Sequence, residues 1–323
     1  MSALKYFLLA TIVVSSAYGQ TGPFTADFQK WLSANGYGSD NFNRPDLGNW
    51  ASFGGKTTSS QKLHHDPVIF IHGNSDCALN SGTGQYETGW TNSIRYFQNQ
   101  GYSSAELYAT TWGDANSANA QSRRHNCQTV QYLRRFVEAV IAYTKASKVD
   151  IISHSMGVTL ARKVVKGGSI SASDGSCNIG AALTDKVDTF LGISGGNYGL
   201  CTCQGFEANI APTCSKDNGY WPGDSCGAFD YLCGFPMPTC TTTPTYSSYM
   251  TELNTNSARE GKYVFVAYSL TDEILMNQNN VWNHKTSSIP GSNGEKIYPS
   301  YTHMQTKEQT AADQYNCVVN HSI

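Results

Sequence analysis

Short apolar runs alternate with segments of helical periodicity along this chain. Residues 68–71 are continuously apolar and residues 149–152 are mostly so, which is typical of strands buried inside a sheet. Each run precedes a segment with helical spacing of apolar residues, at 90–100 and at 158–166. Strands that alternate with helices favour a parallel arrangement. The sequence therefore predicts an α/β fold with a mostly parallel sheet and helices on both of its faces.

Further segments carry either a helical period or a short apolar run. We expect helices at 24–32, 130–146 and 306–318, and strands at 105–112, 190–193 and 263–268. Thr25 is placed to cap the first of these helices.

Residues 1–19 have the pattern of a secretory signal peptide. A short basic region that includes Lys5 is followed by an apolar run at 6–14. Small residues then form a candidate cleavage site before Gln20. A membrane anchor is the alternative, but a hydrocarbon layer of ~30 Å needs about 20 apolar residues. We therefore expect a secreted, extracellular protein.

Ten cysteines form an even set in a chain routed to an oxidising compartment, so we expect disulfides. Six of them fall within 201–240, a stretch rich in Gly, Pro, Thr and Tyr. This predicts a disulfide-stapled insert at about 200–257, with a pairing that the spacing leaves open. A zinc site at Cys201 and Cys203 is the alternative, although no second cysteine or histidine pair lies at ligand spacing.

The charge balance argues against nucleic acid as a partner. The chain has 22 Lys and Arg against 24 Asp and Glu, for a formal charge of −2. No net positive field is therefore available to hold a nucleic-acid backbone or an anionic membrane.

The turn Ser153-His154-Ser155-Met156-Gly157 carries the clearest chemical signal. It matches the nucleophile elbow G-x-S-x-G except that Ser153 replaces the first glycine. Such a pentapeptide arises easily by chance, but here a strand precedes it and a helix follows it. We therefore expect Ser155 to be a nucleophile.

A serine nucleophile needs a histidine base, which follows the serine in folds with this elbow. Downstream of Ser155 the chain offers His284, His303 and His321. His321 lies two residues from the C-terminus, and His284 reads as an ordinary loop histidine. His303 precedes the last helical segment and is the expected base.

The acid that orients the histidine should follow a strand at the carboxyl edge of the sheet. Asp272 follows the strand at 263–268 within a short loop, and Glu273 is its competitor. Either carboxylate could instead be solvated or cap a helix that starts at Ile274. Asp272 is the expected acid.

The loop after residues 68–71 should complete an oxyanion hole. The backbone N–H groups of Asn74 and Met156 are the expected donors. We expect His72, in the same loop, to be a structural histidine. Because Ser155, Asp272 and His303 must meet at one sheet edge, residues 20–323 are expected to form a single domain.

Together these segments resemble the class 2 lipases of the α/β-hydrolase superfamily, whose elbow is commonly A-H-S-M-G. The resemblance covers most of the chain from about Pro67 onward and implies an α/β-hydrolase fold, to which the Cys-rich insert is added, since the stretch 201–240 has no counterpart in the smallest family members. It also implies a carboxylic-ester hydrolase with Ser155, Asp272 and His303 as triad and Asn74 and Met156 as oxyanion donors. Extracellular polyester depolymerases resemble the chain in a similar way and differ in the acyl substrate.

The expected reaction is hydrolysis of an acylglycerol, as in a triacylglycerol lipase, and it requires neither a metal ion nor a cofactor. We expect a monomer that acts on a lipid or other ester and contacts a lipid interface peripherally. A catalytically silent binding protein with the same fold is the rival, and a peptidase or amidase is a weaker one. The insert could form an apolar lid or acyl-binding wall, or a surface excursion held by disulfides. Aromatic residues in or beside it include Tyr198, Phe206, Tyr220, Trp221, Phe229, Tyr231 and Phe235.

Overall fold

A seven-stranded sheet forms the centre of the computed structural model, which describes residues 21–227 and 243–323. Its order is β1-β3-β2-β4-β7-β8-β11, with β1 antiparallel to β3 and all other neighbours parallel. The strands are β1 (Ser52–Phe53), β2 (Val68–Ile71), β3 (Leu107–Thr110), β4 (Val149–His154), β7 (Val187–Ile193), β8 (Tyr263–Ser269) and β11 (Gly294–Tyr298). The predicted mostly parallel sheet is confirmed.

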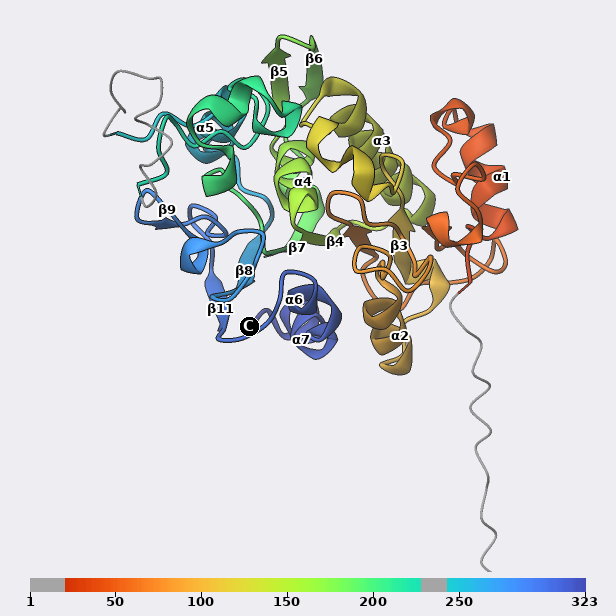
Figure 1. Cartoon of the computed structure of the whole chain (residues 1–323). Helices are drawn as coiled ribbons and strands as arrows, with labels where there is room; N and C mark the ends of the chain where they lie inside the picture. Colours follow the sequence, from red (N-terminus) through yellow and green to blue (C-terminus); the bar gives the residue numbers. More distant parts are fainter. Residues whose placement is uncertain (1–20, 228–242) are drawn as a thin grey trace, which may run out of the picture.

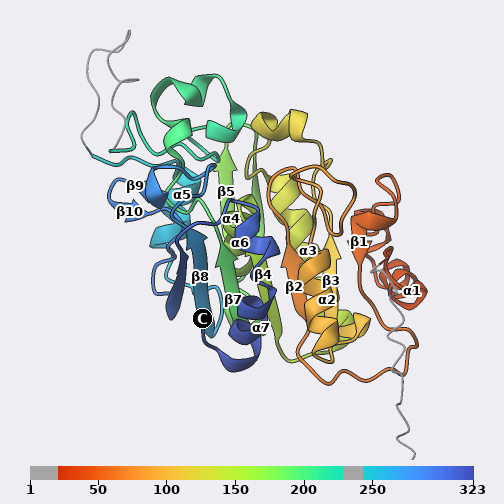
Figure 2. The same ribbon diagram turned by 60° about the horizontal axis from the view of Figure 1, so that its bottom comes forward.

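Helices cover both faces of this sheet (Figures 1 and 2). One face carries α1 (Ala26–Ala34), α3 (Cys127–Thr144), α4 (Met156–Lys166) and α5 (Ser248–Thr255). The other carries α2 (Thr91–Asn99) and α7 (Ala311–Asn320), with α6 (Gln305–Glu308) beside them. Alternate residues of β2 enter the two cores, Ile69 and Ile71 on the α3 side and Val68 and Phe70 on the α2 side.

The expected helices form with small shifts at their ends. The Thr25 side chain caps α1 by accepting a hydrogen bond from the Phe28 N–H. The single helix expected at 306–318 is wrong, because α6 ends at Glu308 and α7 begins at Ala311. At this break the Thr310 hydroxyl donates to the Thr306 carbonyl and the Gln314 amide donates to the Lys307 carbonyl. Side-chain donors thus occupy carbonyls that backbone N–H groups would take in a continuous helix.

Several strands were not expected from the sequence. The hairpin of β5 (Gly168–Ala172) and β6 (Gly175–Gly180) lies outside the main sheet, as does the pair β9 (Asn280–Val281) and β10 (His284–Lys285). These strands and the edge strand β11 are short and at least partly exposed, so they lack the apolar run that marks a buried strand.

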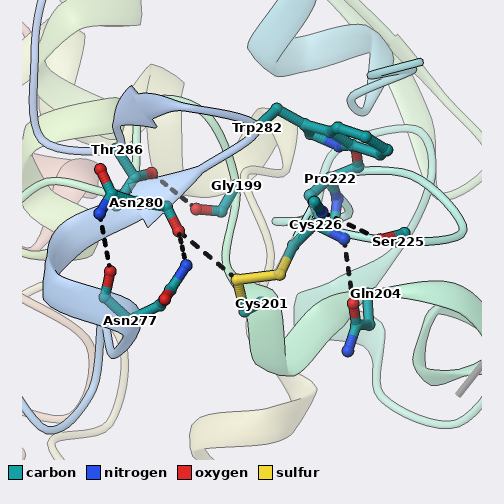
Figure 3. Close-up of a disulfide and its surroundings, with 11 residues drawn as sticks. Gly199, Cys201, Gln204, Pro222, Ser225, Cys226, Asn277, Asn280, Trp282 and Thr286 are labelled. Carbon is teal, nitrogen blue, oxygen red and sulfur yellow. Dashed lines mark hydrogen bonds between the residues drawn. A yellow bond between two sulfur atoms is a disulfide. The ribbon is translucent and has the colours of Figure 1, made fainter. Parts of the chain in front are cut away.

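Among the described residues, three disulfides are present, and two of them lie in the predicted insert. They join Cys127 to Cys177, Cys201 to Cys226 and Cys203 to Cys214. Sulfurs bonded in this way cannot serve as thiolate ligands, so Cys201 and Cys203 do not form the alternative zinc site. Beside the Cys201–Cys226 bond, Trp282 donates its backbone N–H to the Cys226 carbonyl (2.8 Å) and its ring Nε1–H to the Pro222 carbonyl (2.9 Å) (Figure 3). The insert is therefore fastened to the segment around β9 and β10.

Cys77 and Cys317 are buried free thiols, so the expectation that all cysteines pair is wrong for these two. Burial raises the pKa of Cys77 to about 12, and its Sγ–H donates to the Leu79 carbonyl at 3.0 Å. Both thiols lie in the protein interior and not in the disulfide-bonded insert. Cys233 and Cys240 lie outside the described residues.

Tyr220 and Trp221 of the insert are buried, and the Tyr220 hydroxyl lies 2.9 Å from Thr159 Oγ1 on α4. The Tyr220 ring therefore packs against the body of the protein. Phe206 is 54% exposed. Phe229, Tyr231 and Phe235, like the expected signal peptide at 1–19, lie outside the described residues. None of the described helices is long and apolar enough to cross a membrane.

Candidate active site

Ser155 occupies the sharp turn between β4 and α4. Its backbone has φ 54° and ψ −127°, a region that a residue with a side chain rarely adopts. The strand hydrogen bonding nevertheless continues through it, because the Ser155 N–H donates to the Ile193 carbonyl at 2.8 Å. This strained strand-to-helix turn is the geometry expected of a nucleophile elbow.

Small residues around the turn let the strand and helix pass closely. A Cβ on Gly157 would lie 2.4 Å from the His72 carbonyl oxygen, and one on Gly73 would lie 2.7 Å from Ser155 Cβ. Ser153 is fully buried, and its hydroxyl donates to the Leu191 carbonyl at 3.2 Å. A serine therefore fits where the common pattern has a glycine.

His303 and Asp272 form a buried hydrogen-bonded pair. His303 Nδ1 lies 2.8 Å from Asp272 Oδ2, while Asp272 Oδ1 accepts the backbone N–H groups of Ile274 and Leu275. Burial alone raises the pKa of Asp272, but the His303 ring and these N–H donors outweigh it and leave the pKa below its ordinary value. The carboxylate is thus held ionised against the ring. It also caps the turn at Ile274, where no helix forms.

The other candidates for the triad acid and base do not take part in this pair. Glu273 accepts the backbone N–H of His303 at 2.9 Å and does not occupy the ring nitrogen. His284 is exposed in β10, where it stacks on Tyr198. His321 pairs with Asp188 at 2.9 Å.

Ser155, His303 and Asn74 line one cavity of about 180 Å³. Its lining comes from the elbow and from the loops after β2, β3, β8 and β11: Gly73, Asn74, Ser75, Asp76, Tyr86, Ser117, Ala120, His154, Ser155, Ile274, His303 and Met304. No described residue of the insert takes part. Met156 is the first residue of α4, so its N–H is among those without an acceptor inside the helix.

His154 is a site residue to which the sequence analysis assigned no role. It is buried, its Nε2–H donates to the His303 carbonyl at 3.0 Å, and the two rings are 4.7 Å apart. Burial holds the pKa of His154 well below its ordinary value, and the nearby His303 and Lys307 add to this shift. His154 therefore stays neutral and supports the backbone that carries His303. In the sequence, only its position inside the elbow pentapeptide pointed to a role for His154 in the site.

His72 has the structural position expected of it. Its Nδ1–H donates to the Gly73 carbonyl, its Nε2 accepts the Trp112 N–H at 3.0 Å, and its ring stacks on Trp112. Burial lowers its pKa to about 4. A neutral ring with both nitrogens occupied shapes the loop that leads to Asn74.

Comparison with known proteins shows the family to which this chain belongs. A sequence model of the class 2 lipases matches residues 65–316, which spans the elbow, Asp272 and His303. The chain belongs to the class 2 lipase family. As such it is an α/β-hydrolase of the lipase and esterase type, a carboxylic-ester hydrolase.

Several solved structures are similar to this class 2 lipase. A monoacylglycerol lipase from Paleococcus ferrophilus is 14% identical, with 84% of this chain and 98% of that chain covered and a TM-score of 0.46. Lipase B from Aspergillus fumigatus is 13% identical, with 80% and 52% covered and a TM-score of 0.44. A carboxylesterase from Bacillus subtilis is 13% identical, with 84% and 87% covered and a TM-score of 0.42. The chain thus spans about half of the Aspergillus fumigatus protein.

Proposed function

We propose that the chain is a secreted serine hydrolase that cleaves acylglycerols, with Ser155 as nucleophile, His303 as base and Asp272 as the acid that orients it. One observation carries the proposal: the His303–Asp272 pair, 2.8 Å between Nδ1 and Oδ2, opens onto the cavity that also exposes Ser155. A histidine oriented by a buried carboxylate is the base that a serine nucleophile needs.

The pair determines which nitrogen takes the proton. Because Nδ1–H is donated to Asp272, Nε2 carries the lone pair and accepts the Ser155 hydroxyl proton during attack on the ester carbonyl. The ionised Asp272 then stabilises the positive ring, which afterwards gives its proton to the leaving alcohol. Water repeats the cycle on the acyl-enzyme and frees the acid.

The charge that develops on the carbonyl oxygen needs donors. Met156 contributes an N–H from the start of α4, and Asn74 contributes one from the loop beside Ser155. The close packing of Gly73 on Ser155 brings this loop to the nucleophile.

Acylglycerols are the proposed substrate class because the family acts on lipid esters and the cavity wall includes Ala120, Ile274 and Met304. The three disulfides support an oxidising, extracellular setting. We propose a monomer that meets the lipid at its interface.

A substrate panel on the purified protein tests this proposal. We expect turnover of tributyrin and p-nitrophenyl butyrate, slower turnover of a polyester film, and negligible turnover of the matching anilide. Ser153→Ala, which places the family's common residue in the elbow, should keep activity, whereas Ser155→Ala should lose it. Faster cleavage of the anilide than of the esters, or no turnover at all, would contradict the proposal.

A further inference from the structure

A buried ion pair joins the loop that carries the proposed oxyanion donor to α6, the helix that directly follows the proposed base. Lys307 Nζ lies 2.5 Å from Asp76 Oδ2, and the two side chains are 0% and 1% exposed. Asp76 lies two residues after Asn74, and Lys307 lies one helical turn after His303. The pair therefore connects segments 231 residues apart in the sequence at the point where they form one site.

The hydrogen bonds around this pair fix it in one geometry. Lys307 Nζ also donates to the Thr88 hydroxyl at 3.0 Å and to the Gly89 carbonyl at 2.7 Å, so all three ammonium donors are used. Asp76 Oδ1 accepts the Gly89 N–H at 3.0 Å. The ammonium group lies 5.4 Å from the centre of the Trp90 ring, just before α2, and α2 and α6 lie on the same face of the sheet (Figure 2).

Such a pair contributes little stability compared with apolar side chains of similar size. The cost of removing both charges from water offsets most of their attraction, and replacement by apolar residues is often neutral or stabilising. What the pair supplies is a directional contact of fixed length between two loops. Apolar side chains at these positions would pack but would not set that length.

We infer that Asp76 and Lys307 are positioning residues that hold the Asn74 N–H at its working distance from Ser155 and His303. The inference rests on the proposed function. The other contacts of the two loops agree with it. The His303 carbonyl accepts from His154 and from the Thr306 hydroxyl, which fixes the base to the elbow. Asp76–Lys307 then fixes the oxyanion loop to the base.

Replacing both partners tests the inference, because removal of one alone leaves a buried charge and can prevent folding. Asp76→Asn/Lys307→Met keeps an acceptor for the Gly89 N–H and removes both charges. The matched control is Lys163→Met/Glu252→Gln, which removes a 2.6 Å lysine–carboxylate pair between α4 and α5, outside the cavity. Kinetics on p-nitrophenyl butyrate and inhibition by an alkyl boronic acid, which mimics the tetrahedral intermediate, are measured for the full-length chains.

For Asp76→Asn/Lys307→Met we expect kcat to fall about 10- to 100-fold, KM to stay within about threefold and boronate binding to weaken in parallel with kcat. The control should change kcat by less than about twofold. A folded double variant with the wild-type kcat overturns the inference, as does an equal loss in the control.

Two further measurements keep the test decisive. If the double variant does not fold, Thr88→Val removes one acceptor of the Lys307 ammonium group and leaves the ion pair. We expect kcat to fall two- to fivefold in this variant, about the size of one weakened contact. Such a fall supports the inference, and an unchanged kcat overturns it. A wild-type protein that a fluorophosphonate does not label at Ser155 contradicts the proposed function itself. A labelled wild type with an unaffected double variant contradicts the positioning role alone.

Discussion

His303 Nδ1 lies 2.8 Å from Asp272 Oδ2, and both residues are 3% exposed. The carboxylate is itself held by two backbone N–H groups. Neither partner can rotate freely, so the ring presents Nε2 in one orientation and one tautomer.

Asp272→Asn should therefore inactivate the enzyme without unfolding it. The amide keeps the size of the side chain but favours the wrong ring tautomer, and we expect kcat to fall by about 10⁴-fold. Steady-state kinetics and a melting curve measure the two effects. Glu273→Gln is the matched control, because Glu273 accepts from the backbone N–H of His303 and from the Gln85 amide but does not contact the His303 ring nitrogens. A larger loss of kcat in Glu273→Gln than in Asp272→Asn would mean that the acid is wrongly assigned.

Gly73→Ala should reduce kcat/KM by about 100-fold, because a methyl group 2.7 Å from Ser155 Cβ must displace the nucleophile or the Asn74 loop. Gly38→Ala serves as the control, since its nearest contact is an ordinary 3.5 Å. Ester hydrolysis measures both variants. Wild-type activity in Gly73→Ala would show that the loop and serine are not in tight contact.

Acid should destabilise the protein below pH 6.5. Burial lowers the pKa of His72 and His125 to about 4, so the folded state binds fewer protons than the unfolded state between pH 6.5 and about 4. Their contribution is complete above pH 6.5 and is lost as the pH falls, by ~2 kcal/mol per histidine at pH 5.

Urea unfolding at pH 8 and pH 5 measures this effect. His125→Gln should lose less stability between the two pH values than the wild type does, by ~2 kcal/mol. Equal losses in the two proteins would mean that His125 is not a buried neutral ring.

Replacement of Cys201 and Cys226 by serine should lower the free energy of unfolding by about 3 kcal/mol, because the bond closes a loop of 25 residues. Because no described residue of the insert lines the cavity, kcat on a short ester should stay within about threefold. Urea unfolding and kinetics separate the two readouts. A fall in kcat together with unchanged stability would instead favour an insert that forms part of the acyl-binding wall.

The elements that follow from the sequence are those with a strong local pattern. β2 and β4 are buried apolar runs, and α1 has a capping threonine, so each was predicted close to its observed bounds. β11 and the β5–β6 hairpin carry no such pattern. Contacts with neighbouring strands and the Cys127–Cys177 disulfide hold them in place, and these contacts do not require an apolar run. The break between α6 and α7 depends on side-chain hydrogen bonds that residue spacing does not show.

The residues of the candidate site also fall into two groups, those with a local sequence signal and those without one. Ser155 follows from its turn and Asp272 from its place after a strand, since each has a local signal. The contact of Asp76 with Lys307, and that of His154 with the His303 carbonyl, join residues 231 and 149 positions apart. Pairs of this kind form only when the sheet brings distant loops to one edge.

Mass spectrometry of the protein after treatment with a fluorophosphonate tests whether Ser155 is the nucleophile. We expect one adduct per chain, on the peptide that carries Ser155. The adduct should be absent in Ser155→Ala and should form much more slowly in His303→Ala. An adduct on another residue, or undiminished ester hydrolysis by Ser155→Ala, would contradict this assignment.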